Sequence, residues 1–274
     1  PRAEALDRRD DDARVELVDV LPGEAHAIER ARREVLDHDV AMLDQPLDDL
    51  RDPQRTDMEN ACVEIYREVG TLFLRAGKIR EAWMYLRPSG DREPMAAALG
   101  QTPVSESNLQ ELVELALYEG IAPALGFSLV LDHFGVCNAI TTFESLMLTR
   151  PAAQQQAAAA LLVQRVHRDL IGNVRADIAR QENAAPREAS LAGLIDQRDW
   201  LFAENNYHLD ATHLHATVRF ARLLADAPEL HMARDIAAYG SRLAPPFQFA
   251  GDEPFVDTYP AHLLFFDALL GERV

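Results

Sequence analysis

Residues 63–96 read VEIYREVGTLFLRAGKIREAWMYLRPSGDREPMA, and this stretch decides the fold. Apolar residues recur at helical intervals through its first half, where Val69 and Phe73 lie one turn apart. Gly77 stands where that helix must end, because glycine adopts the left-handed conformation of a helix C-cap without steric strain. A second apolar run follows from Lys78 to Arg87. The stretch therefore predicts a helix, a tight turn and a second helix.

The large and small residues of this stretch resemble those of one tetratricopeptide repeat, a 34-residue helix–turn–helix unit. Counted from Val63 as position 1, positions 4, 7, 8, 11, 15, 20, 24, 27 and 32 hold Tyr66, Val69, Gly70, Phe73, Gly77, Ala82, Leu86, Ser89 and Pro94. Gly70 has no side chain, so the second helix can approach the first closely. One such unit cannot bury its own hydrophobic face, so the resemblance implies neighbouring helix pairs.

Residues 214–247 repeat part of the same spacing. With Leu214 as position 1, positions 7, 8, 11, 20, 24, 27 and 32 hold Phe220, Ala221, Leu224, Ala233, Ala237, Gly240 and Pro245. Pro228 stands at position 15, where the motif usually has glycine. The remaining sequence has helical periodicity without a clear repeat. We therefore expect an all-α fold of stacked antiparallel helix pairs, which form either a curved tetratricopeptide-like solenoid or a compact bundle.

Composition along the chain indicates three regions. Residues 1–14 are dense in charge and are expected to form a mobile acidic segment. Residues 15–182 are expected to form a helical-repeat region, and residues 187–274 a C-terminal helical region in one continuous domain with it. Residues 245–260 are rich in proline and aromatic residues and predict a packed loop before a last helix over 260–270. Further helices are expected over residues 24–43, 105–118, 121–134, 136–148, 151–181 and 190–204.

The chain carries 45 acidic and 27 basic residues, and its formal net charge is −18. This balance argues against nonspecific binding to nucleic acid or to an anionic membrane, because both favour a basic surface. Lys78 is the only lysine, and there is no glycine-rich phosphate-binding motif, so we expect no cofactor. Cys62 and Cys137 are the only cysteines and form no disulfide framework, which suits a reducing compartment such as the cytoplasm.

Residue types that bind metals cluster in NNYHLDATHLHATVRF, residues 205–220. His208, Asp210 and His213 are the candidate ligands. His213 and His215 would point about 200° apart on a helix, so both cannot face one ion without a third element. The alternative is that Asp210 or Thr212 caps the following helix and that the histidines divide between core and surface.

A cysteine and a histidine flank a predicted helix break in LDHFGVCNAITTFES, residues 131–145. His133 could serve as a base for Cys137 as nucleophile. No third residue that would orient the histidine is identifiable, and an uncharged thiol in an apolar stretch is usually part of a core. The motif therefore leaves a catalytic pair and a structural role as alternatives.

Basic residues line one face of each predicted repeat. His215, Arg219 and Arg222 recur at i, i+4 and i+7, and such a stripe could receive a carboxylate or a phosphate. The alternative is a solvated face paired with Asp226 and neighbouring carboxylates. The first repeat offers a similar face, formed by Arg67, Arg75 and Arg80.

The resemblance implies recognition rather than catalysis. Tetratricopeptide-like solenoids present a concave groove that takes an extended peptide or a helix of a partner protein. By that resemblance Arg67, Arg75, Arg219 and Arg222 are the groove-facing candidates. Two alternatives stay open: a metal-dependent or Cys/His enzyme on a helical scaffold, and an obligate homodimer whose groove is filled by its own partner chain.

Overall fold

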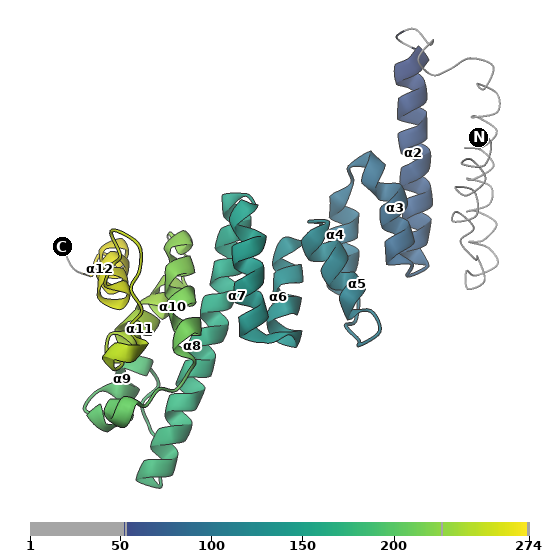
Figure 1. Ribbon diagram of the computed structural model, residues 1–274. Coiled ribbons are helices and arrows are strands. Elements are labelled where there is room, and N and C mark those ends of the chain that lie inside the picture. Colours follow the sequence, from purple (N-terminus) through teal and green to yellow (C-terminus); the bar gives the residue numbers. More distant parts are fainter. Residues whose placement is uncertain (1–51, 53, 226, 273–274) are drawn as a thin grey trace, which may run out of the picture. The chain divides into compact units, whose positions relative to one another are not determined.

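The computed structural model describes residues 52, 54–225 and 227–272. Regular structure in these residues is helical apart from one β-bridge between Ala250 and Asp257, which confirms the predicted all-α class (Figure 1). The chain divides into two compact units, one ending at Ala122 and the other beginning at Pro123. None of the described helices is long and apolar enough to cross a membrane. The expected segment 1–14 and helix 24–43 lie outside the described residues.

The described part of the first unit begins with the predicted helix pair, α2 (Gln54–Arg75) and α3 (Ile79–Ser89), which pack side by side (Figure 1). Gly77 joins them with a φ of 72°, and the backbone N–H of Lys78 donates to the carbonyl of Phe73 across the turn. A Cβ atom on Gly70 would lie 2.5 Å from Cγ of the buried Leu86. The two helices therefore touch where the sequence places a glycine.

The rest of this unit consists of α4 (Arg92–Gln101), α5 (Leu109–Val113) and a π-helical turn, η2 (Glu114–Tyr118). α3 continues through Pro88 to Ser89, and Pro94 lies in the first turn of α4. A proline is tolerated in a first turn because the N–H groups there have no acceptor within the helix. The expected helix over 105–118 is instead divided between α5 and η2.

The second unit begins with α6 (Pro123–His133) and α7 (Gly135–Ser145), which are separated at Gly135 as predicted. A 3-10 turn, η3 (Met147–Thr149), leads into the long helix α8 (Ala152–Glu182). Phe143 of α7 packs edge-on against Phe127 of α6 and stacks on Phe220 of α10 (Ala211–Phe220) at 4.2 Å between ring centroids. These rings join α6, α7 and α10 into one core.

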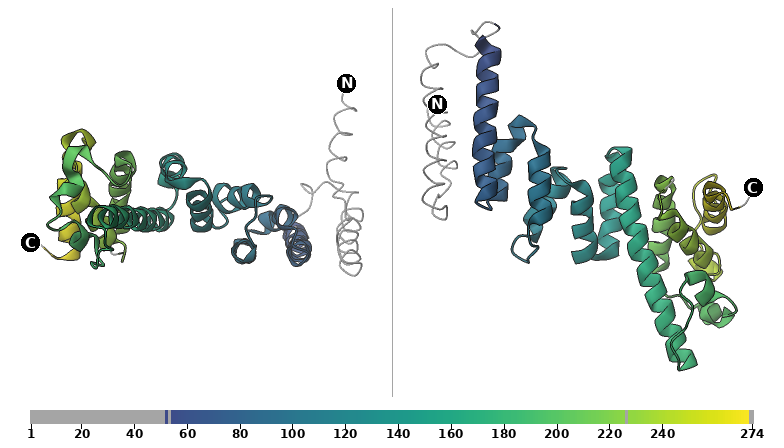
Figure 2. Two further views of the ribbon diagram at one scale, coloured as in Figure 1. Left: turned by 90° about the horizontal axis from the view of Figure 1, so that it is seen from below. Right: turned by 180° about the vertical axis from the view of Figure 1, so that it is seen from behind.

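The C-terminal helices pack on α8 and on one another (Figure 2). They are α10, the 3-10 turn η5 (Ala221–Leu224), α11 (Leu230–Gly240), the turn η6 (Pro245–Phe247) and α12 (Thr258–Leu270). Before them, the expected helix over 190–204 is broken into α9 (Leu191–Ile195) and the 3-10 segment η4 (Asp199–Asn205). The break occurs because Asp196 is extended and Gln197 has a φ of 56°.

Candidate functional site

The second unit has an open pocket of about 740 Å³ between the C-terminal part of α8 and η4. This volume lies in the range of pockets that bind ligands. Its lining residues belong to two segments, residues 177–182 of α8 and residues 200–207 around η4. They are Asp177, Arg180, Gln181, Glu182, Trp200, Ala203, Glu204, Asn205, Asn206 and Tyr207.

Asp177 connects this pocket to a buried polar network beneath it. Nε2 of His208 lies 3.1 Å from Oδ2 of Asp177, and Nδ1 of His208 lies 2.8 Å from the hydroxyl of Tyr239. The backbone N–H of His208 also donates to that hydroxyl, at 3.0 Å. Because an ionised carboxylate only accepts, Nε2 donates to Asp177 and the Tyr239 hydroxyl donates to Nδ1 in the neutral ring.

The network shifts the titration of two of its members. Burial raises the pKa of Asp177, but hydrogen bonds from His208 and Arg180 outweigh burial, so that this pKa lies below its ordinary value. Burial raises the pKa of Tyr239 well above its ordinary range. Asp177 is therefore ionised and Tyr239 neutral at pH 7. The ring nitrogens of His208 both have partners, so the network forms a rigid floor for the pocket.

The rim of the pocket adopts unusual backbone conformations. Glu204 and Asn205 have φ values of 55° and 63°, in the left-handed region. Asparagine tolerates this region, whereas the longer side chain of glutamate makes it less favourable. The amide of Asn206 ties the segment down by donating to the carbonyl of Leu201 at 3.1 Å and to Asp177 at 3.4 Å. Such strain, fixed by the surrounding structure, is common at ligand sites.

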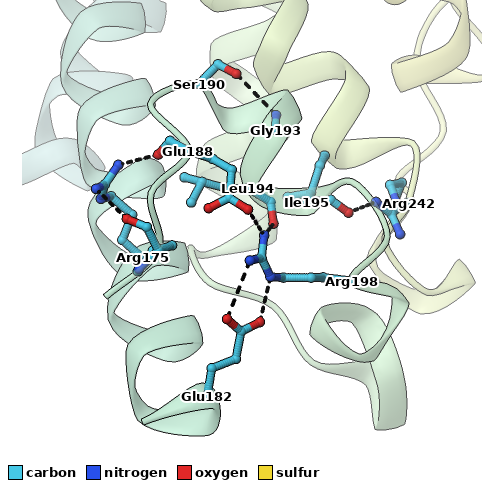
Figure 3. Close-up of polar contacts among 10 residues, drawn as sticks. Arg175, Glu182, Glu188, Ser190, Gly193, Leu194, Ile195, Arg198 and Arg242 are labelled. Carbon is cyan, nitrogen blue, oxygen red and sulfur yellow. Dashed lines mark hydrogen bonds and ion pairs between the residues drawn. The ribbon is translucent and has the colours of Figure 1, made fainter. Parts of the chain in front are cut away.

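Three arginines hold the segment that carries the pocket wall (Figure 3). Arg198 bonds Glu182 at 2.7 Å and Glu188 at 2.9 Å. Arg175 donates to the carbonyl oxygens of Glu188 and Pro186, at 2.7 and 3.2 Å. Arg242 donates to the carbonyl of Ile195 and pairs with Asp199. Residues 186–199 are thereby fastened to α8 and to the turn after α11, which fixes the position of η4.

The pocket combines aromatic rings with negative charge. Trp200 is 37% exposed and Tyr207 49%, although large aromatic side chains are usually buried. The carboxylates of Asp177, Glu182 and Glu204 line the same pocket. Arg180 is the one cation among the lining residues, and it is paired with Asp177. The pocket therefore suits a cationic group, which aromatic faces and carboxylates both attract.

None of the sequence-predicted site residues lines this pocket. Asp210 caps α10 by accepting from the backbone N–H of Thr212 at 2.8 Å, as predicted. His208 lies beneath the pocket, where its ring bonds Asp177, and His213 follows the cap on α10. Among the described residues, no three His, Cys, Asp or Glu side chains gather closely enough to hold a metal ion.

The predicted Cys–His pair lies at the break between α6 and α7. His133 and Cys137 are both exposed. The expectation that this thiol belongs to the core is wrong, because α7 buries Ala139 and Phe143, and Cys137 lies on the opposite side of the helix. Neither side chain has a hydrogen bond or ion pair to any residue that the structure describes.

In the first unit, the predicted arginines serve mainly as structural partners. Arg67 pairs with Asp91 and Glu64, and the hydrogen bonds that its guanidinium donates to these carboxylates raise its pKa. Arg80 pairs with Glu114 at 2.8 Å. Arg75 is exposed on α2 and lines a surface recess together with Arg67.

The predicted stripe of His215, Arg219 and Arg222 is the best assembled of the sequence candidates. It lies on α10 and η5, and the loop before α12 covers it with Phe249 and Phe255. Asp226, the expected partner of this stripe, lies outside the described residues.

Sequence reasoning missed the pocket because its residues come from distant segments. The Asn205–Asn206 pair and the neighbouring Trp200 are the only local signals of a polar aromatic turn. The one histidine beside the pocket, His208, has hydrogen-bond partners at both ring nitrogens. The sequence matches no protein-family profile and no curated protein, and the structure matches no solved structure.

Proposed function

We propose that this protein is a tetratricopeptide-like recognition protein that binds a basic segment of a partner protein in the pocket between α8 and η4. The observation that carries the proposal is the joint presence of Trp200, Tyr207 and Glu204 in one open pocket. A lysine or arginine side chain would place its charge near Glu204 and its stem along the aromatic rings.

The charge of the pocket supports a cationic ligand over an anionic one. Arg180 is neutralised by Asp177, and Glu182 is paired with Arg198. Glu204 is exposed and has no ion pair within the described chain. The net charge of −18 adds a long-range field that attracts basic segments and repels acidic ones.

The polar lining supports an extended peptide. Gln181 and Asn205 each carry an amide that can both donate and accept, as the backbone of an extended chain requires. A partner protein in the cytoplasm stays a prediction from the sequence.

The alternatives have less support from the described contacts. An enzyme would need a reactive group in the pocket, and His208, which bonds Asp177 and Tyr239, is not among the residues that line it. An obligate homodimer would need a basic segment of a second copy to fill the acidic pocket, and the chain carries 45 acidic residues against 27 basic ones. The experiment below separates the homodimer from the proposed function.

The test measures binding of a fluorescein-labelled peptide of alternating arginine and serine by fluorescence anisotropy. A matched peptide with glutamate in place of arginine serves as the ligand control. The arginine peptide is expected to bind and the glutamate peptide is not. Trp200→Ala should weaken binding about tenfold, because it removes both the ring contact and the cation–π attraction.

Charge variants distinguish a specific site from general attraction. Glu204→Gln should weaken binding of the arginine peptide several-fold, whereas Glu106→Gln, which removes one exposed carboxylate in the first unit, should leave it unchanged. Equal losses of affinity in the two variants would show that the arginine peptide is attracted by the overall negative charge and not by a specific site. A dimer that excludes the peptide in analytical ultracentrifugation would instead favour the homodimer.

A further inference from the structure

A second group of residues in the same unit has the opposite charge. It consists of His215 and Arg219 on α10, Arg222 on η5 and His262 on α12, and is called the cationic cluster below. Phe255 joins two of its members, since the guanidinium carbon of Arg222 lies 4.9 Å from the ring centroid and the His262 ring stacks on the same ring at 4.3 Å. Phe255 therefore links Arg222 of η5 to His262 of α12.

The aromatic loop, residues 248–257, forms a cover over this cluster. A β-bridge between Ala250 and Asp257 closes the loop, and Thr258 donates to the carbonyl of Phe249 at 2.8 Å. Phe249 packs edge-on against the ring of His215 at 5.5 Å between centroids. Arg219 remains about one third exposed, so the cluster is reachable from solvent on that side.

Two ring nitrogens of the cluster are buried without a hydrogen-bond partner among the described residues, Nδ1 of His215 and Nε2 of His262. His262 is wholly buried, and its Nδ1 donates to the carbonyl of Thr258 at 2.6 Å. The proton therefore resides on Nδ1, and Nε2 presents a lone pair. Buried polar atoms without a partner are rare in folded proteins and usually mark the place of a water molecule or a ligand.

The arginines of the cluster also lack close carboxylates. Arg222 donates to the carbonyl of Arg219 at 2.9 Å and has no carboxylate within ion-pair distance in the described chain. The nearest partner of Arg219 is Glu144, at 4.0 Å. Burial and Arg219 lower the pKa of Arg222, and the more distant Asp252 only partly opposes them. A negative charge bound here would offset the repulsion between the guanidinium groups of Arg219 and Arg222.

The histidines are neutral in this surrounding. Burial lowers the pKa of His215, and Arg219 lowers it further. Burial, together with the neighbouring Arg222, His215 and Arg219, lowers the pKa of His262 to about 4. The cluster thus offers two permanent positive charges next to two neutral imidazoles. In one of these, His262, Nε2 is available as a hydrogen-bond acceptor.

We propose that the cationic cluster binds a small oxyanion that also carries a hydroxyl donor, such as hydrogen phosphate or a hydroxy acid. Arg219 and Arg222 bind the anionic oxygens, and Nε2 of His262 accepts from the hydroxyl. The pocket between α8 and η4 takes the opposite charge, so this site extends the proposed function and does not depend on it.

The test is isothermal titration calorimetry of the full chain at pH 7.5 with inorganic phosphate and with glycolate. Sulfate and acetate, which lack a donor at this pH, are the matched ligands. Tighter binding of phosphate than sulfate, or of glycolate than acetate, supports the proposal. A preference within the first pair identifies the ligand as a phosphate, and one within the second pair identifies it as a hydroxy acid. Equal affinities within both pairs, or no binding heat with phosphate and glycolate, overturn it.

Variants connect the binding heat to the cluster. Arg222→Gln should weaken binding at least tenfold, a typical effect for removing a charge-assisted hydrogen bond. Arg168→Gln removes one exposed arginine from α8 and should change affinity less than twofold. His262→Gln should abolish the preference for the ligand with a donor. If circular dichroism shows that this buried variant does not fold, the half-buried His215→Gln replaces it. In His215→Gln the ratio of affinities between the ligand with a donor and its matched ligand should be smaller than in the wild type. Unchanged affinity in Arg222→Gln overturns the proposal.

Discussion

Replacing Gly70 with alanine tests the contact between α2 and α3. In a helix that can accept the new methyl group, Gly→Ala stabilises a protein by about 0.4–1 kcal/mol. At Gly70 the added Cβ would lie 2.5 Å from Cγ of Leu86 and 3.2 Å from the carbonyl oxygen of Ala82. Leu86 is wholly buried and cannot move toward solvent. Overpacking of this kind costs about 1–3 kcal/mol, so we expect a net destabilisation of about 1 kcal/mol.

The assay is urea denaturation followed by the fluorescence of Trp83, which is buried in the first unit, in a Trp200→Phe background. Gly100→Ala in α4 is the control, because a Cβ there has no atom within 4 Å, and it should stabilise the same unit. In a Leu86→Ala background the new methyl group no longer overlaps with the leucine side chain, and Gly70→Ala should become stabilising. The interaction energy between the two substitutions should be about 2 kcal/mol. Stabilisation by Gly70→Ala in the wild-type background would refute the close packing of the two helices.

Two further predictions concern the second unit. The pKa of His262 is about 4 in the folded chain and 6.5 when unperturbed, so the unfolded chain takes up the proton first as the pH falls. The contribution of His262 to the free energy of unfolding should fall by about 3 kcal/mol between pH 7 and pH 4. Urea denaturation at each pH measures this, and the loss of stability should be smaller in His262→Gln. Tyr239→Phe should lower the free energy of unfolding by about 2 kcal/mol, because it leaves Nδ1 and the backbone N–H of His208 without their partner. Thermal unfolding measures this change, and an unchanged midpoint would contradict the proposed network.

Local patterns account for the part of the fold that could be predicted. The apolar spacing around Val69 and Phe73, with Gly77 after it, defines α2 and α3 because the signals and their consequences lie within a few residues. The same holds for the break at Gly135 and for the cap at Asp210. Each of these depends on the conformation of one residue, which the sequence specifies directly.

Contacts between distant residues account for the parts that could not be predicted. The segment 190–204 has helical periodicity, yet Arg175 and Arg242 hold the chain around α9 from other elements, and Gln197 is left-handed. The pocket joins Asp177 to Asn206, and the cationic cluster adds His262 to a stripe on α10. Helical periodicity reports one face of one helix and carries no information about which distant helix covers it.

The different surroundings of the arginines explain why the cationic cluster is a candidate site while the other basic faces are not. Arg67, Arg80 and Arg198 each reach at least one carboxylate within 3 Å, which is unsurprising in a chain with 45 acidic residues. Arg222 is half-buried, and its partners are a carbonyl oxygen and the ring of Phe255. Burying a cation away from carboxylates is unfavourable in the empty protein and becomes favourable when an anion is bound. An overall charge of −18 would repel that anion at long range, so the selectivity of this site has to come from the short-range contacts of Arg219, Arg222 and His262.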